Sequence, residues 1–290
     1  MPYETLIIVL RRITIWFCSA FLCFIPLTAQ QQATLPGTYA PGDASVAYSK
    51  AWFPFSTPAA LAAQQQSGIQ ILYENRYITK TLANKSLNLW FATPYFNIGG
   101  SFTHFGYSSY HEMMGALTLA RQLGEHVRLG VEVDYFSVYL SEIGEYHGAV
   151  TAQVGLQVVP CRHLVLGFNL FNPTFSSVKT DELSTRLPVR FQLGFCYSIG
   201  GMVDWHVEVD KTLQMPWRWA TGFEYSPYDL SNFVVRLGAN GSRFIQPSMG
   251  VGFEIQGFGI DVDAQYHTRL GFSLMGALRY RFSYHKKSMK

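Results

Sequence analysis

The sequence has few charged residues for its length. Only 14% of its 290 residues are charged, against roughly 25% in an average soluble domain. Hydrophobic residues make up 48% and aromatic residues 16%, a composition that excludes a disordered chain. The formal net charge is +3, with Lys and Arg scattered along the chain. Because nothing concentrates that charge into a basic face, we expect no nucleic-acid partner.

Long apolar runs are almost absent. The mean hydropathy of +0.08 is low for a bundle of membrane helices. The one sustained run, 13–27, is shorter than the roughly 20 residues that a membrane-spanning helix needs. Arg11 and Arg12 precede the run, and Thr28 and Ala29 supply small residues near the expected cleavage point. We therefore expect residues 1–29 to be a cleaved signal peptide, with an uncleaved anchor as the alternative.

Cysteine is scarce as well, with four in the chain. Cys18 and Cys23 fall inside the predicted signal peptide. Cys161 and Cys196 remain in a protein sent to a compartment where disulfides persist. Their predicted positions make a disulfide geometrically conceivable, if the Cα atoms come within about 7 Å. Free thiols are the alternative. The pattern indicates no metal site and no cofactor.

From residue 69 onward the chain lacks a helical stripe and alternates instead between apolar and polar residues. The segment 205–210 is the clearest example, because its odd positions are Trp, Val and Val and its even positions are His, Glu and Asp. This period of two indicates strands. Fourteen such segments follow one another, at 69–76, 86–93, 96–105, 112–122, 126–140, 147–159, 163–171, 188–199, 202–210, 217–226, 232–240, 244–256, 257–267 and 272–282.

The two faces of these segments distinguish a membrane barrel from a soluble sandwich. The outward face of a sandwich is usually rich in Lys, Glu and Thr, but here Lys is scarce on every segment. The second face mixes Gly, Ala, Ser and Gln with opposed charges, and the apolar face is rich in aromatics, as in transmembrane barrels. We predict an all-β fold, a transmembrane antiparallel barrel of about 14 strands over residues 68–282, followed by a basic tail at 283–290.

The connections agree with this topology. An even number of strands leaves both termini on one side of the membrane. Short turns are expected on that side and longer loops on the other, with 172–187 the longest loop and 226–231 the exception. The short turns are 93–94, 124–125, 160–162 and 200–201.

The polar faces predict a charged lumen. Charges of both signs on adjacent strands favour structural pairing around a plug, with a movable polar constriction as the alternative. The lumen-facing candidates are Arg128, Glu132, Asp134, Arg190, Asp204, His206, Glu208, Asp210, Arg218, Glu224, Arg236, Glu254, Asp261, Asp263, Arg279 and Arg281. His206 and Glu208 lie close enough for an acid–base pair or part of a metal site. No nucleophile accompanies them, so we predict a satisfied lumen histidine, no catalytic residue and no enzyme.

Residues 30–67 form a leader that does not alternate. It contains the small-residue stretches 42–47 and 51–62, the second with prolines at its turns. Together with later segments such as 73–76 and 207–211, the leader resembles that of PorV/PorQ-type outer-membrane proteins, which are relatives of the FadL-like fatty-acid channels. Residues 42–47 resemble a Gly-x-Ala-x-Val-Ala segment of that family. Thr57, Pro58 and Ala59 stand where Asn-Pro-Ala is usual.

The resemblance implies that the leader enters the lumen as a plug, with Asp43, Thr57, Pro58 and Ala59 among its residues. It implies a non-enzymatic protein of the outer membrane of a Gram-negative bacterium. The expected role is accessory or docking, linked to type IX secretion, with outer-membrane lipid, secreted proteins or secretion components as partners. One alternative is a FadL-like passive channel for a hydrophobic small molecule, with Pro247 as a candidate strand break for a lateral opening. The other is a structural barrel without transport.

Overall fold

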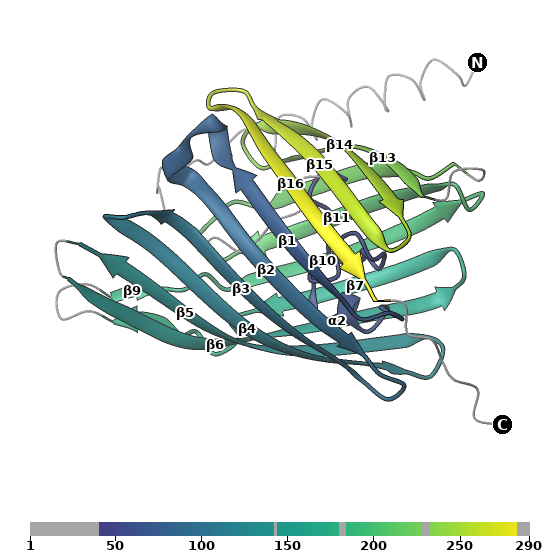
Figure 1. The fold of residues 1–290 in the computed structure, drawn as a ribbon, viewed down its shortest axis with the longest axis horizontal. Helices are drawn as coiled ribbons and strands as arrows, with labels where there is room; N and C mark the ends of the chain where they lie inside the picture. The colour runs from purple at the N-terminus through teal and green to yellow at the C-terminus, as the bar shows by residue number, and fades with distance from the viewer. Residues whose placement is uncertain (1–40, 142–143, 180–183, 228–231, 283–290) are drawn as a thin grey trace, which may run out of the picture. The chain divides into compact units, whose positions relative to one another are not determined.

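The computed structural model describes residues 41–141, 144–179, 184–227 and 232–282. Fourteen antiparallel strands close into a barrel (Figure 1). The predicted signal peptide and the predicted basic tail lie outside the described residues, as does the start of the leader. Within the described part of the chain, no helix has the length and hydropathy of a membrane span.

The barrel strands follow one another in chain order around the wall. They are β1 (Gly68–Asn75), β2 (Ala83–Ala92), β3 (Asn97–Tyr107), β4 (Tyr110–Leu123), β5 (Val127–Leu140), β6 (Glu145–Cys161), β7 (Leu164–Phe171), β10 (Arg190–Ile199), β11 (Val203–Thr212), β12 (Arg218–Tyr225), β13 (Phe233–Gly241), β14 (Ile245–Ile255), β15 (Phe258–His267) and β16 (Gly271–Arg281). The barrel closes where β1 pairs with β16, from Gly68 opposite Arg281 to Asn75 opposite Leu274.

Four short elements accompany the barrel. They are the helix α2 (Pro58–Leu61), the 3-10 turns η1 (Arg76–Ile78) and η2 (Lys80–Leu82), and a hairpin of β8 (Ser177–Lys179) and β9 (Ser184–Arg186). Each of the fourteen predicted segments corresponds to one barrel strand, with ends that differ by a few residues. The β8–β9 hairpin lies in the expected loop 172–187. It was not predicted because its three-residue strands are too short to display a period of two.

The alternation seen in the sequence separates two faces of the wall. Apolar side chains point outward, as in Leu117, which is 71% exposed, and Leu193, which is 55% exposed. Charged side chains point inward and are buried, as in Asp134, Glu224 and Arg236 at 0% exposure. A water-soluble protein has the opposite arrangement. An apolar outer face with a polar interior is that of a transmembrane barrel.

We call the end where β1 begins and β16 ends the near rim, and the opposite end the far rim. The near rim carries tight turns, for example 124–126, 162–163 and 256–257. The far rim carries the longest connection, 172–189, which includes the β8–β9 hairpin. The longest connection is therefore at the predicted end, but the far rim also carries tight turns, such as 108–109 and 242–244.

Pro247 does not break its strand. It is the third residue of β14 and lies opposite Ala239 of β13, in a register that runs without a shift from Phe233 to Gly241. Pairing of β14 with β15 begins only at Ser248. Pro247 therefore lies one residue before the β14–β15 ladder begins, near the start of the strand.

The candidate disulfide between Cys161 and Cys196 is not formed, and both cysteines are free. Cys161 ends β6 and lies opposite Leu164 of β7, whereas Cys196 belongs to β10 and lies opposite Val165 of β7. The strand β7 thus separates the two cysteines. Two strand spacings amount to roughly 9.5 Å, which exceeds the Cα separation that a disulfide tolerates.

We predict that the two thiols differ in reactivity. Cys161 is exposed and Cys196 is partly buried on the inner face. A maleimide added to the folded protein in mild detergent should therefore modify Cys161 first, and mass spectrometry of peptides measures the order. Equal protection of both thiols, with an intact mass two hydrogens lower, would contradict the free-thiol assignment.

Candidate functional site

The leader runs through the barrel interior, where glycines in the wall admit its backbone. A Cβ at Gly130 of β5 would lie 2.2 Å from the carbonyl oxygen of Pro58, and one at Gly222 of β12 would lie 2.7 Å from that of Pro41. Any side chain at these positions would therefore collide with the leader. The wall glycines that contact leader atoms in this way include Gly99, Gly130, Gly155, Gly167, Gly194, Gly222 and Gly238.

The short helix α2 is held at both ends. Thr57 is its N-cap, with Oγ1 accepting a hydrogen bond from the Ala60 N–H at 3.2 Å, and Pro58 occupies the first turn. Thr and Asn are both good N-caps, so Thr57 can cap this helix as well as an Asn would. At the other end, Asn97 Nδ2 of β3 donates to the carbonyl oxygens of Leu61 and Gln64, at 2.7 and 2.8 Å.

Apolar contacts anchor the leader from Trp52 to Ala62. Leu61 and Ala62 pack against Trp90 of β2 and Ala120 of β4 in one buried cluster. A second cluster joins leader residues Tyr48, Trp52 and Phe53 to the wall residues Leu72, Val234, Met275 and Ala277. Trp90 Nε1 also donates to the carbonyl oxygen of Gln66 at 2.7 Å. This half of the leader is therefore fixed mainly by burial of apolar surface.

Polar contacts hold the leader from Asp43 to Lys50. Glu208 Oε2 accepts hydrogen bonds from the backbone N–H groups of Ser45 and Val46, at 2.7 and 2.8 Å. Arg218 Nη1 pairs with Asp43 Oδ2 at 2.7 Å. Gln157 Nε2 donates to the carbonyl oxygens of Val46 and Tyr48, at 3.1 and 3.0 Å. Inward-facing side chains thus satisfy the leader backbone where it has no strand or helix partner.

Lys50 makes a two-sided ion pair with the wall. Its Nζ lies 2.6 Å from Asp204 Oδ2 and 2.6 Å from Glu224 Oε1. Burial alone would lower the pKa of the Lys50 ammonium, but the carboxylates of Glu224 and Asp204 outweigh burial and raise the pKa above its ordinary value. Lys50 therefore stays charged and joins β11 and β12 to the leader.

Arg236, like Asp134 and Glu224, is a fully buried charge of the lumen. Its Nε lies 2.9 Å from Glu224 Oε2, and its Nη1 contacts Asp261. The rings of Trp52 and Phe53 lie 5.1 and 4.9 Å from its guanidinium carbon. These contacts offset the cost of burying the charge, and they link β12, β13 and β15 to the leader.

The remaining predicted lumen residues also lie on the inner face. Arg279 and Arg281 both pair with Glu254, and Arg279 donates to the Ala51 carbonyl oxygen. Arg190 lies 3.3 Å from Asp210.

The structure therefore brings most of the predicted set into one network around the leader. Glu132 does not join this network and contacts Thr118. Arg128 does contact the leader, because its Nη1 donates to Ser49 Oγ at 3.0 Å. His206 stacks on Tyr48, with ring centroids 5.3 Å apart, rather than pairing with Glu208.

Sequence reasoning missed Gln157, Tyr48 and Lys50. Gln157 shares the inward parity of Arg128, its partner across β5 and β6, so the alternation contained a signal for it. Tyr48 and Lys50 lie in the leader, which has no periodicity. Their partners are more than 150 positions away in sequence, as for the Tyr48 hydroxyl that donates to Glu224 Oε2 at 2.7 Å.

Two further features lie at the two ends of the lumen. A cleft of about 760 Å³ opens at the near rim between leader residues 62–67, the turn 92–97 and the end of β4. At the far rim, Met114 of β4 and Phe136 of β5 point inward and are covered by Val178 and Leu187 of the 172–189 connection. The lumen thus has an apolar patch at one end and a cleft beside the leader at the other.

The sequence matches no protein-family model and no curated protein. Solved structures do resemble it. The Pseudomonas putida toluene transporter TodX has a TM-score of 0.61 at 9% identity, over 87% of this chain and 98% of that one. A Pseudomonas aeruginosa FadL homologue has a TM-score of 0.55 at 12% identity, over 85% of this chain and 96% of that one. At these identities the likeness shows the fold, and it confirms the predicted fourteen-stranded barrel.

We predict that Gly130→Ala dislodges the leader around α2. The new methyl group would meet the Pro58 backbone at 2.2 Å, and overpacking of this kind costs about 1–3 kcal/mol. Lys50 is the only Lys or Arg among residues 41–66, so tryptic cleavage after Lys50 measures release. Gly115→Ala is the control, because a Cβ there meets nothing within 4 Å. Equal cleavage rates for the two variants would contradict the packing argument.

Proposed function

We propose that this protein is a passive channel for small hydrophobic molecules in the outer membrane of a Gram-negative bacterium, and that its leader gates the lumen. The single observation that carries the proposal is the leader itself, which lies in the lumen with a polar half and an apolar half. The fold shared with a toluene transporter and a FadL homologue supports the same class.

The outer surface supports the location. Aliphatic and aromatic side chains point outward along the strands, including Ile71, Val133, Trp219, Phe253 and Tyr280. Burying this surface in water-free surroundings is favourable by roughly 25 cal/mol per Å², so the exterior suits a hydrocarbon layer. The closed hydrogen-bonding of the wall leaves no strand edge to be satisfied by water.

The inward apolar patch at the far rim supports the ligand class. Met114 and Phe136 form an apolar patch on the inner face near the far rim, and the covering residues Val178 and Leu187 come from a connection rather than from the wall. Displacement of that connection would expose an apolar surface to an arriving molecule. Such a surface binds hydrocarbon and repels ions, because nothing in it pairs with a charge.

The leader contacts support gating. Most of the polar contacts of residues 41–50 involve charged groups. Each contributes about 1.5–3 kcal/mol net and can be replaced by water, so these residues can leave the wall one contact at a time. The apolar clusters around Trp52 and Trp90 retain the rest of the leader during that movement. The cleft at the near rim borders residues 62–67, where the retained half ends. Its volume lies within the range of small-molecule sites.

The accessory role in type IX secretion, and the PorV/PorQ type that implied it, stay predictions. The solved structures described above are a transporter of toluene and a FadL homologue, which favours the channel. A structural barrel without transport remains the alternative, in which Met114 and Phe136 would serve only to seat Val178 and Leu187.

The ligand test is native mass spectrometry of the protein extracted from outer membranes in mild detergent. We expect a retained apolar small molecule. Phe136→Asn should lose most of it because the apolar patch becomes polar, whereas Met114→Leu, which conserves volume and polarity, should keep it. Retention of a protein instead, or equal retention by both variants, would count against the channel.

The gate test is single-channel conductance in a planar bilayer. Deletion of residues 32–50 removes the polar half of the leader and should raise the conductance. Lys50→Met should raise the open probability without changing the largest conductance, because it removes only the bridge to Asp204 and Glu224. Lys80→Met, in the exposed η2 turn, is the matched control. An unchanged trace for the deletion would exclude the leader as the gate.

A further inference from the structure

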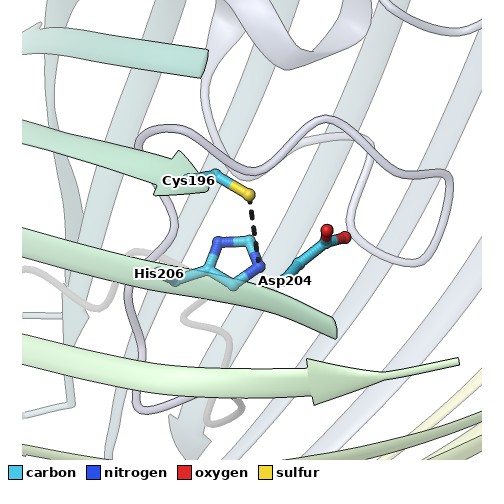
Figure 2. A group of neighbouring side chains, drawn as sticks. All are labelled: Cys196, Asp204 and His206. Carbon is cyan, nitrogen blue, oxygen red and sulfur yellow. Dashed lines mark hydrogen bonds between the residues drawn. The ribbon is translucent and has the colours of Figure 1, made fainter. Parts of the chain in front are cut away.

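Three side chains with different donor atoms converge on the inner wall near the near rim. Cys196 of β10 lies directly opposite His206 of β11, and Asp204 precedes His206 by two residues on the same inward face. Figure 2 shows the Cys196 thiol reaching from its strand to the His206 ring, with Sγ 3.8 Å from Nε2. One ligand atom from each of the three residues lies within 4.8 Å of the others.

We infer that Cys196, Asp204 and His206 form a binding site for a Zn²⁺ ion. Thiolate, imidazole and carboxylate are the ligands that zinc takes in proteins, and three of them leave the fourth position to water. Tetrahedral coordination at zinc bond lengths places a sulfur and a nitrogen ligand about 3.5 Å apart. The separation of 3.8 Å between Cys196 Sγ and His206 Nε2 is close to that value.

The His206 imidazole provides a second and independent observation. It is only 3% exposed, and its Nδ1 has no hydrogen-bond partner among the described residues. Its Nε2 meets only the weak Cys196 thiol. A buried ring nitrogen without a strong partner is unfavourable, and coordination would give Nε2 a strong partner while leaving Nδ1 as it is. Stacking on Tyr48 fixes the ring plane.

Charge balance favours a divalent cation. Zinc binding converts the Cys196 thiol to a thiolate, and its proton goes to solvent with no change of oxidation state. The ion, the thiolate and the Asp204 carboxylate then sum to zero. Lys50 would give up Asp204 and keep its pairing with Glu224, so that one ammonium still faces one carboxylate. Lys50 is able to move because its side chain is 41% exposed.

Zinc and the leader residue Lys50 would compete for Asp204. Asp204 Oδ2 accepts Lys50 at 2.6 Å, and its other oxygen accepts the Ser198 hydroxyl. A zinc ion on Asp204 removes one of the two carboxylates that hold Lys50. Zinc would thereby loosen the polar half of the leader, a consequence that rests on the proposed gating function. The metal site itself does not depend on that function.

The test uses the full chain, purified in mild detergent, freed of metal with a chelator and titrated with Co²⁺ and then Zn²⁺. We expect one Co²⁺ per chain with a thiolate charge-transfer band in the near ultraviolet, which Zn²⁺ abolishes. Cys196→Ser and His206→Gln should weaken binding by at least about tenfold. Cys161→Ser is the matched control, since Cys161 is exposed and two strands away.

Lys50→Met gives a readout that a purely structural cluster would not produce. Removing the competing ammonium should tighten zinc binding severalfold, because Asp204 becomes free to coordinate. A binding constant in Cys196→Ser equal to that of the unaltered chain would overturn the proposal. Loss of the band in Cys161→Ser, or weaker binding in Lys50→Met, would overturn it too.

A folding check keeps the outcome clear. Each variant should retain the difference in gel mobility between boiled and unboiled samples that a folded membrane barrel displays. If Cys196→Ser does not fold, the Cys161→Ser protein still tests the site, because zinc should slow maleimide modification of its remaining thiol. An unchanged rate of modification would contradict zinc binding. If the protein binds no zinc but conducts normally, the zinc site is refuted, while the proposed channel function is not affected.

Discussion

The main constraint on this structure is a lumen too wide for the strands to fill. In a barrel of about eight strands, inward side chains alone fill the interior, whereas fourteen strands enclose more space than their inward side chains occupy. An isolated buried charge is very costly, and the wall pairs many of its inward charges with one another. The leader solves both problems at once. Its backbone fills the space beside wall glycines, and its Asp43 and Lys50 complete ion pairs that the strands begin.

The filling of the lumen by the leader explains why some ion pairs lie within the wall and others need the leader. Cross-strand pairs such as Arg236 with Glu224 and Arg190 with Asp210 need only the wall. Glu208 is different, because it accepts two backbone N–H groups of the leader as well as neighbouring side chains. If the leader moved away, Glu208 would keep its wall partners and exchange the leader amides for water. The polar half of the leader is thus replaceable by solvent, while the Trp52 cluster is not.

The wall was predictable from the sequence, and the contents of the lumen were only partly so. Alternation alone assigns Asp204, His206 and Glu208 to one face, and the turn at 200–202 sets the register of β10 and β11. That register brings Cys196 opposite His206, a pairing which simple counting across the turn would reach. The disulfide expectation failed because β7 separates β6 from β10. Contacts of Tyr48, Lys50 and Asp43 were out of reach, since no periodicity relates a leader to strands far along the chain.

The two ends of the lumen differ in what they offer a hydrophobic molecule. At the far rim the inward surface is apolar and covered by a connection, so a hydrocarbon gains by leaving water there. Toward the near rim the wall is charged and tied to the leader through Asp204, Glu224 and Lys50. In the proposed channel, a hydrophobic molecule that occupies the apolar patch would next meet these ion pairs. They would have to open before it could pass, so the leader, rather than the width of the barrel, would control flow.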